Sequence, residues 1–183
     1  YHLINMQDVS DRYQEFYNDL FQRISETKVL NLWYGHLSGD VKSHTFNVPP
    51  ETILSVSLHD VDGDKHDNIT TPIEVFKCFA EDVYSSGFSL CSMADYLRLP
   101  KEQRCKYIVC TFDDGYSGLI KNALPIMNLH GFTATVFVCA DYIGKNNDWN
   151  YKDKTTRRHL NINELKTLQN NGWEIGSHGM THQ

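Results

Sequence analysis

Short apolar runs alternate with longer amphipathic segments from residue 53 to the end of the chain. The apolar runs have the length and composition of strands, and the predicted strands are 53–58, 88–91, 107–112, 133–140 and 173–176. Between them apolar residues recur at helical spacing, and the predicted helices are 72–86, 92–97, 119–129 and 162–170. Pro125 lies inside the third helix and predicts a kink or an irregular turn there. Strands that alternate with helices predict an α/β fold, in which parallel strands are joined by helices on the outside.

Two of these helices carry sequence signals for their first turn. Thr71 can cap the first of them, Pro72 suits its first helical position, and Glu74 completes a capping box. Asn161, with Glu164 at the third helical position, predicts the same arrangement for the last helix. Both helices should therefore begin where these signals stand.

Residues 1–50 have a different organisation. The segment 11–26 places apolar residues along one stripe of a predicted amphipathic helix, and 29–34 is a short predicted strand followed by a loop. Pro49-Pro50 marks a break, after which we place the main unit. The first part is therefore an N-terminal extension of unknown role, in which His2 is structural or incidental.

Composition excludes some classes of protein. The net charge of −6 and the pI near 5.8 argue against a nucleic-acid partner, which favours a basic face. No run approaches the roughly 20 apolar residues of a membrane span. The five cysteines form no Cys-x-x-Cys pair and lie beside apolar residues, which indicates buried free thiols and leans towards a reducing compartment. Localisation and oligomeric state stay open, and because the chain starts at Tyr1 and stops at Gln183 we expect a segment of a longer protein.

Candidate chemistry gathers where predicted strands end. His59, the pair Asp113-Asp114, and His178 each follow a strand, and reactive groups in parallel sheets collect at the carboxyl ends of strands. His178 and His182 are four residues apart, so on a helical turn their side chains would share one face. One aspartate and two histidines supply three ligands for a divalent metal, with an open position for water. The second aspartate remains available to transfer protons, so the set predicts a hydrolytic metal site.

The main unit resembles the polysaccharide deacetylases of the NodB-homology type, carbohydrate esterase family 4. Two segments match that family's first two motifs: Thr111-Phe112-Asp113-Asp114-Gly115-Tyr116 and Ser177-His178-Gly179-Met180-Thr181-His182. The helix at 123–126 and the strand at 133–138 resemble the family's segments between those motifs. The resemblance implies an enzyme that removes acetyl groups from an N-acetylated amino sugar, with a carbohydrate as partner.

Residue roles follow from this resemblance. It implies that Asp113 is the catalytic base and that Asp114, His178 and His182 bind one divalent ion, for which we expect zinc. The segment around His59 resembles the subgroup that deacetylates poly-N-acetylglucosamine, where an upstream histidine is the general acid. Leu58 stands where that subgroup usually has a tyrosine, which places one substrate contact in question.

The family's later motifs would lie beyond Gln183. We therefore expect an incomplete or distorted (β/α) barrel of the NodB-homology type, with 51–183 as a deacetylase domain truncated at its C-terminal end.

Two other groups of residues are weaker candidates for a binding site. Asp60, Asp62 and Asp64 superficially resemble a calcium loop, but Lys65 replaces its glycine and Thr71 its final glutamate. The remaining histidines have no partner at ligand spacing and are expected on the surface: His36, His44, His130 and His159.

Two functional alternatives stay open. One is a hydrolase of the same fold that cleaves another amide, such as a ureide or cyclic imide, and the other is a metal-binding carbohydrate module without turnover.

Overall fold

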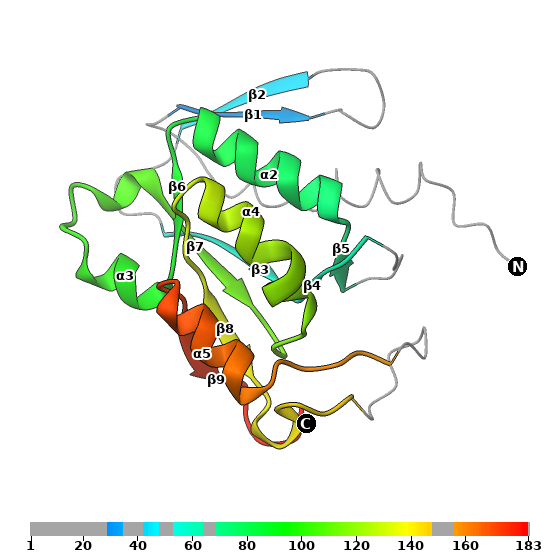
Figure 1. The fold of residues 1–183 in the computed structure, drawn as a ribbon. Helices are drawn as coiled ribbons and strands as arrows, with labels where there is room; N and C mark the ends of the chain where they lie inside the picture. Colours follow the sequence, from blue (N-terminus) through cyan, green and yellow to red (C-terminus); the bar gives the residue numbers. More distant parts are fainter. Residues whose placement is uncertain (1–28, 35–41, 48–52, 64–68, 148–155, 183) are drawn as a thin grey trace, which may run out of the picture. The chain divides into compact units, whose positions relative to one another are not determined.

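The computed structural model describes residues 29–34, 42–47, 53–63, 69–147 and 156–182 (Figure 1). The chain divides into two units, Tyr1–Thr52 and Ile53–Gln183, and each is described by itself. None of the helices in these described ranges is long and apolar enough to cross a lipid bilayer.

The first unit contains an antiparallel pair of strands, β1 (Val29–Tyr34) and β2 (Lys42–Asn47). The predicted strand at 29–34 is confirmed. The loop expected after it is wrong at 42–47, because pairing with β1 forms a strand from a largely polar segment whose own β-propensity is weak. The predicted helix at 11–26 lies outside the described residues.

The second unit alternates strands and helices, as the sequence predicts. Its strands are β3 (Leu54–Leu58), β4 (Asp60–Val61), β5 (Thr70–Thr71), β6 (Ser89–Cys91), β7 (Tyr107–Phe112), β8 (Thr135–Val138) and β9 (Glu174–Ser177). Its α-helices are α2 (Ile73–Ser85), α3 (Met93–Arg98), α4 (Leu124–Leu129) and α5 (Ile162–Asn170). Shorter helical turns are 3₁₀ at Arg104–Lys106 and Ala140–Tyr142 and π at Leu119–Ala123.

Strand β7 is the centre of a parallel sheet. The strand order is β3-β7-β8-β9, and β6 pairs with the first half of β7. Every pair in this sheet is parallel. From Ile108 to Phe112 each residue of β7 is buried, as expected for a strand covered on both faces. The predicted α/β fold with parallel strands and outer helices is confirmed; α2 packs beside α4, and α5 lies along β9 (Figure 1).

The start of α2 differs from the prediction. Thr71 does not cap this helix, because it is buried in β5, which pairs with β4 just after β3. Pro72 occupies the N-cap position instead, without a side-chain hydrogen bond. Pairing with Asp60–Val61 therefore overrides the local capping signal and ties the loop after β3 to the beginning of α2.

The irregularity predicted near Pro125 is confirmed. Residues Leu119–Ala123 form a π-helical turn that continues directly into α4, whose first turn contains the proline. Proline has no N–H to donate to the preceding turn, and the widened turn lies immediately before it.

The five cysteines are free thiols, as predicted. Four of them are buried and Cys78 is partly buried. Burial raises the pKa of Cys91 to about 11, with Asp95 adding to the shift. This thiol is therefore a neutral packing group at pH 7.

Helix α5 begins with the predicted capping box. The Asn161 side chain accepts hydrogen bonds from the N–H groups of Asn163 (2.9 Å) and Glu164 (3.0 Å), and Glu164 accepts one from the N–H of Asn161 at 2.8 Å. Arg158 also donates two hydrogen bonds to the Glu164 carboxylate, at 2.8 and 2.7 Å. These contacts fix the start of the helix that precedes β9 and its histidines.

The Arg158 contact holds the pKa of Glu164 below its usual value. A depressed carboxyl pKa contributes stability above the unfolded-state pKa, and this stability is lost as the pH falls through the folded-state pKa. We expect Glu164→Gln to lower the free energy of unfolding by about 1 kcal/mol at pH 7, with the deficit shrinking below about pH 4. Urea unfolding of both proteins across this pH range checks it, with Glu81→Gln on the exposed side of α2 as control. A deficit independent of pH would contradict the ionic contribution.

Candidate metal and catalytic site

The chain turns sharply where β7 ends. The N–H of Asp113 still donates to the carbonyl of Leu58 on β3 at 2.8 Å, which continues the ladder by one residue. Asp114 and Gly115 then both adopt left-handed backbone conformations, with φ of 67° and 72°. A side chain at Gly115 would also lie 2.8 Å from the Val138 side chain. This close approach to β8 requires glycine, and it aims Asp114 into the unit.

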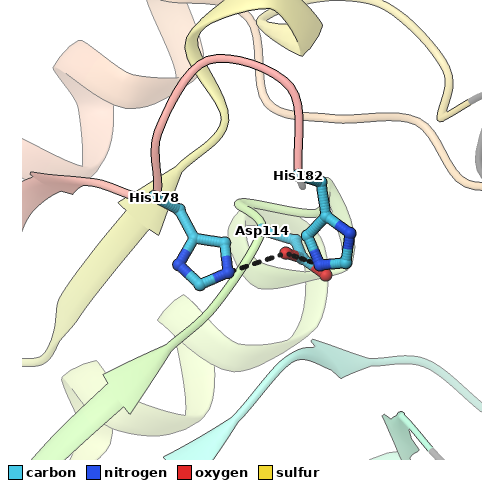
Figure 2. A group of neighbouring side chains, drawn as sticks. All are labelled: Asp114, His178 and His182. Atoms are coloured by element: carbon cyan, nitrogen blue, oxygen red, sulfur yellow. Dashed lines mark ion pairs between the residues drawn. The ribbon is translucent and has the colours of Figure 1, made fainter.

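Asp114 is brought together with both predicted histidine ligands (Figure 2). Its Oδ1 lies 3.4 Å from Nε2 of His178 and 3.2 Å from Nε2 of His182. One ligand atom from each of the three side chains lies within 4.8 Å of the others. The carboxylate side chain has no exposed surface, whereas the two imidazoles are 36% and 30% exposed. The open side of the group therefore faces solvent.

The two histidines lie on a loop rather than on the helical turn expected from their spacing. Gly179 has φ of 82° and His182 has φ of 36°, so the chain reverses between them. The loop is held by backbone hydrogen bonds from His178 N to Val138 O (2.8 Å) and from Ala140 N to Gly179 O (3.0 Å). The two imidazoles do lie close together, as predicted, but the predicted helical turn is wrong, because hydrogen bonds with the end of β8 fold residues 178–182 into a loop.

The donor set fits a divalent first-row ion. Two imidazole nitrogens and one carboxylate oxygen are the ligands that zinc prefers, and three protein ligands with an open fourth position are typical of catalytic sites. The exposed edges of His178 and His182 leave room for that position on the solvent side. The identity of the ion stays a prediction.

Asp113 takes a different environment from its neighbour. It is partly buried and lies outside the group of three ligand atoms. The hydroxyl of Ser57 on β3 donates a hydrogen bond to its Oδ2 at 3.2 Å. Sequence reasoning did not identify Ser57, whose only signal is its place on the exposed face of β3. The two adjacent carboxylates are thus separated, with one directed at the histidines and the other held beside β3.

Comparisons with known proteins show similarity to polysaccharide deacetylases. Residues 100–183 match the family described as polysaccharide deacetylase. This chain resembles the polysaccharide deacetylases. A curated relative from Bacillus subtilis (strain 168), "Putative polysaccharide deacetylase YxkH", is 24% identical over 118 residues, which cover 63% of this chain and 38% of the relative.

Two solved deacetylase structures share the fold. The deacetylase PplD of Streptococcus pyogenes, solved in complex with acetate, superposes with a TM-score of 0.59 at 18% sequence identity. The match covers 74% of this chain and 59% of the PplD chain. A de-N-acetylase from Aggregatibacter actinomycetemcomitans superposes with a TM-score of 0.56 at 15% sequence identity, and the match covers 69% of this chain and 54% of the de-N-acetylase chain. The present chain thus spans less than two thirds of the length of each of these relatives.

His59 lies on the same rim as the deacetylase motif. The parallel register pairs Leu58 with Phe112, so the next position along each strand places His59 beside Asp113. The predicted pairing of these two strands in one sheet is confirmed. His59 is partly buried and lies outside the group of three ligand atoms, so its role as an acid stays a prediction.

His159 is not a surface residue, and that prediction is wrong. It is 2% exposed, and its Nδ1 lies 2.8 Å from the backbone carbonyl oxygen of Asp114. Burial lowers the pKa of this imidazole. The rings of Tyr116 and Tyr142 lie against it, with centroid distances of 4.7 and 5.5 Å. No local pattern marks this position, because its burial depends on segments distant in sequence.

Two further residues refine the surroundings. Cys139 is 1% exposed, and its thiol lies 4.0 Å from Oδ1 of Asp114. Burial, with a contribution from Asp114, raises the pKa of this thiol, so it stays neutral beside the carboxylate. His130, also expected on the surface, is partly buried with its ring 4.9 Å from that of Tyr84. His36 lies outside the described residues, and of His44 only the place on β2 is described.

The geometry predicts how metal content depends on the two aspartates. We expect Asp114→Ala to lose most of the bound divalent ion, because the buried carboxylate is the one directed at both imidazoles. Asp113→Asn should retain the ion and serves as the matched control. Elemental analysis of both proteins after equilibration with Zn²⁺ and desalting checks the difference, and equal metal content would refute this assignment of ligands.

Proposed function

We propose that this chain is the metal-binding catalytic part of a carbohydrate N-deacetylase. One observation carries the proposal. A buried Asp114 with two partly exposed histidines lies directly beside a second carboxylate, Asp113, at the carboxyl ends of parallel strands. Similarity to polysaccharide deacetylases supports the reaction class.

Asp114, His178 and His182 are the residues that would hold the ion. When bound by these residues, a divalent ion would supply Lewis-acid chemistry, which could polarise a carbonyl group and lower the pKa of a water molecule towards about 7. The buried carboxylate adds a negative charge that favours a cation, while the partly exposed imidazoles leave the substrate side open.

Asp113 is the proposed general base. Its carboxylate accepts a proton from the attacking water as the bond from the water oxygen to the acetyl carbon forms. Ser57 donates a hydrogen bond to one oxygen of this carboxylate, which restricts its orientation and leaves the other oxygen for the water. The place of Asp113 outside the ligand group suits this role, because a base must exchange protons during each turnover.

His59 is the proposed general acid. The bond between the acetyl carbon and the nitrogen breaks readily only if the nitrogen receives a proton, since an amide anion is a poor leaving group. His59 follows β3 at the position next to Asp113, so it can approach the nitrogen from the side of β3. The products are acetate and a free amine on the sugar.

The proposed substrate is an N-acetylated amino sugar within a polysaccharide. The names of two relatives, a polysaccharide deacetylase and a de-N-acetylase, support this class. The segment from β3 to β6 resembles the poly-N-acetylglucosamine subgroup, which favours a polymer of that sugar. Zinc is the proposed ion because the ligands are two nitrogens and one oxygen.

Asp113→Asn tests the base and the reaction together. In the whole protein loaded with Zn²⁺, we expect the variant to release acetate from N-acetylglucosamine oligomers about 10²–10⁴-fold more slowly, because amide cannot accept the proton. Metal content should be unchanged. Acetate release by the parent on oligomers, with no hydrolysis of a cyclic imide or ureide, is expected. The reverse preference, or a fully active Asp113→Asn, would overturn the proposal.

His59→Gln tests the acid. We expect normal metal content and a turnover reduced by about 10²–10⁴-fold, with the loss smaller for a substrate whose leaving group needs no proton, such as an aryl acetate. His130→Gln is the matched control, because this histidine precedes β8 at the opposite end of the strands. Equal losses on the amide and on the ester would argue against proton donation by His59.

A further inference from the structure

The conformation of Asp114 needs support from outside its own turn. Its φ of 67° is a left-handed conformation that is uncommon outside glycine, although asparagine and aspartate adopt it more often than other residues do, and it needs support from the surrounding structure. The next residue, Gly115, is left-handed as well. Since the direction of the Asp114 carboxylate depends on this turn, whatever holds the turn also determines where the ligand points.

The segment 158–160 makes hydrogen bonds with this turn and with the residues that follow it. His159 Nδ1 lies 2.8 Å from the carbonyl oxygen of Asp114, and the N–H of Leu160 donates to the carbonyl of Gly115, also at 2.8 Å. The N–H of Ser117 donates in turn to the carbonyl of Arg158 at 2.9 Å. A carbonyl oxygen can only accept, so Nδ1 of His159 carries the proton in this contact.

The imidazole itself is held in place. His159 is 2% exposed, and the rings of Tyr116 and Tyr142 pack against it. Tyr116 and His159 also form an isolated antiparallel bridge. The donor is therefore held in place by packing and by pairing of the backbone.

The same segment reaches the other half of the site. Arg158 binds the Glu164 carboxylate at the first turn of α5, and α5 leads through β9 to His178. Residues 158–160 thus contact the turn of one ligand and the helix that precedes the other two. This is an arrangement that can keep the three ligands in register.

We propose that His159 is a positioning residue for the metal site, which holds the left-handed turn of Asp114 through its Nδ1–H and so aims the carboxylate at His178 and His182. The inference rests on the proposed assignment of these three residues as metal ligands. His159 touches neither the substrate nor the ion in this role. Its effect should therefore appear in ion affinity, before any catalysis.

Two amide substitutions separate this role from simple packing. His159→Asn places an amide nitrogen near the position of Nδ1, whereas His159→Gln places the same group near the position of Nε2. We expect His159→Gln to weaken Zn²⁺ binding by roughly 10–100-fold, as is typical when a residue that orients a metal ligand is replaced. We expect His159→Asn to keep most of the parent's affinity. Titration against a chelating dye, with no substrate present, measures both.

Leu168→Ala is the control for lost core stability. This residue of α5 is buried, and its backbone carbonyl accepts hydrogen bonds from Asn171 and Trp173 rather than from the turn at Asp114. Urea unfolding of the metal-free proteins should show that it is at least as destabilised as His159→Gln, while its Zn²⁺ affinity stays within about threefold of the parent. Equal affinities of the Asn and Gln variants, or a loss in Leu168→Ala as large as in His159→Gln, would overturn the proposal. A parent that binds Zn²⁺ but releases no acetate would overturn the proposed function and leave this inference intact.

Discussion

The site depends on one buried carboxylate held in an unfavourable backbone conformation. Asp114 has a side chain with no exposed surface and a left-handed φ, and both features cost free energy unless the surroundings compensate. The compensation comes from several segments: the imidazoles of His178 and His182, the carbonyl contact of His159, and the close approach of β8 to Gly115. A buried charge of this kind favours a cation among its neighbours, which is why its geometry points to a metal site.

The parallel sheet determines which groups can meet at this carboxylate. Strand β7 pairs with β3 along its length and with β8 at its end, so the residues that follow these strands share one rim. Strand β9 pairs with β8 and delivers His178 to the same rim. Residues separated by more than a hundred positions in the sequence therefore converge at one end of the sheet, as is usual for the active sites of α/β proteins.

Two adjacent aspartates acquire different environments through a single turn of the backbone. Asp113 continues the ladder with β3 and accepts a hydrogen bond from Ser57, whereas Asp114 turns inward towards the histidines. In the proposed function this separation would let one carboxylate bind the ion and the other exchange protons, a division that two carboxylates in one environment would not provide. Two solved deacetylases share the fold of this chain, which spans only part of the length of those relatives.

The sequence by itself determined the elements and the residue types of the site. Hydrophobic periodicity predicted the α-helices of the second unit and the five strands of its parallel sheet, because strand and helix periods are local properties of the chain. It missed the short strands β4 and β5, whose pairing is not visible in the sequence. The capping box at Asn161 was equally local and was confirmed, whereas the one expected at Thr71 failed because β4 pairs with that residue. The family resemblance had already implied that Asp114, and not Asp113, belongs with the two histidines, and these three side chains lie together. Only the tertiary structure decided that His178 and His182 meet across a loop and that His159 contacts the backbone of the Asp114 turn. These outcomes depend on contacts between segments far apart in the chain, and such contacts cannot be read from the local sequence pattern around a residue.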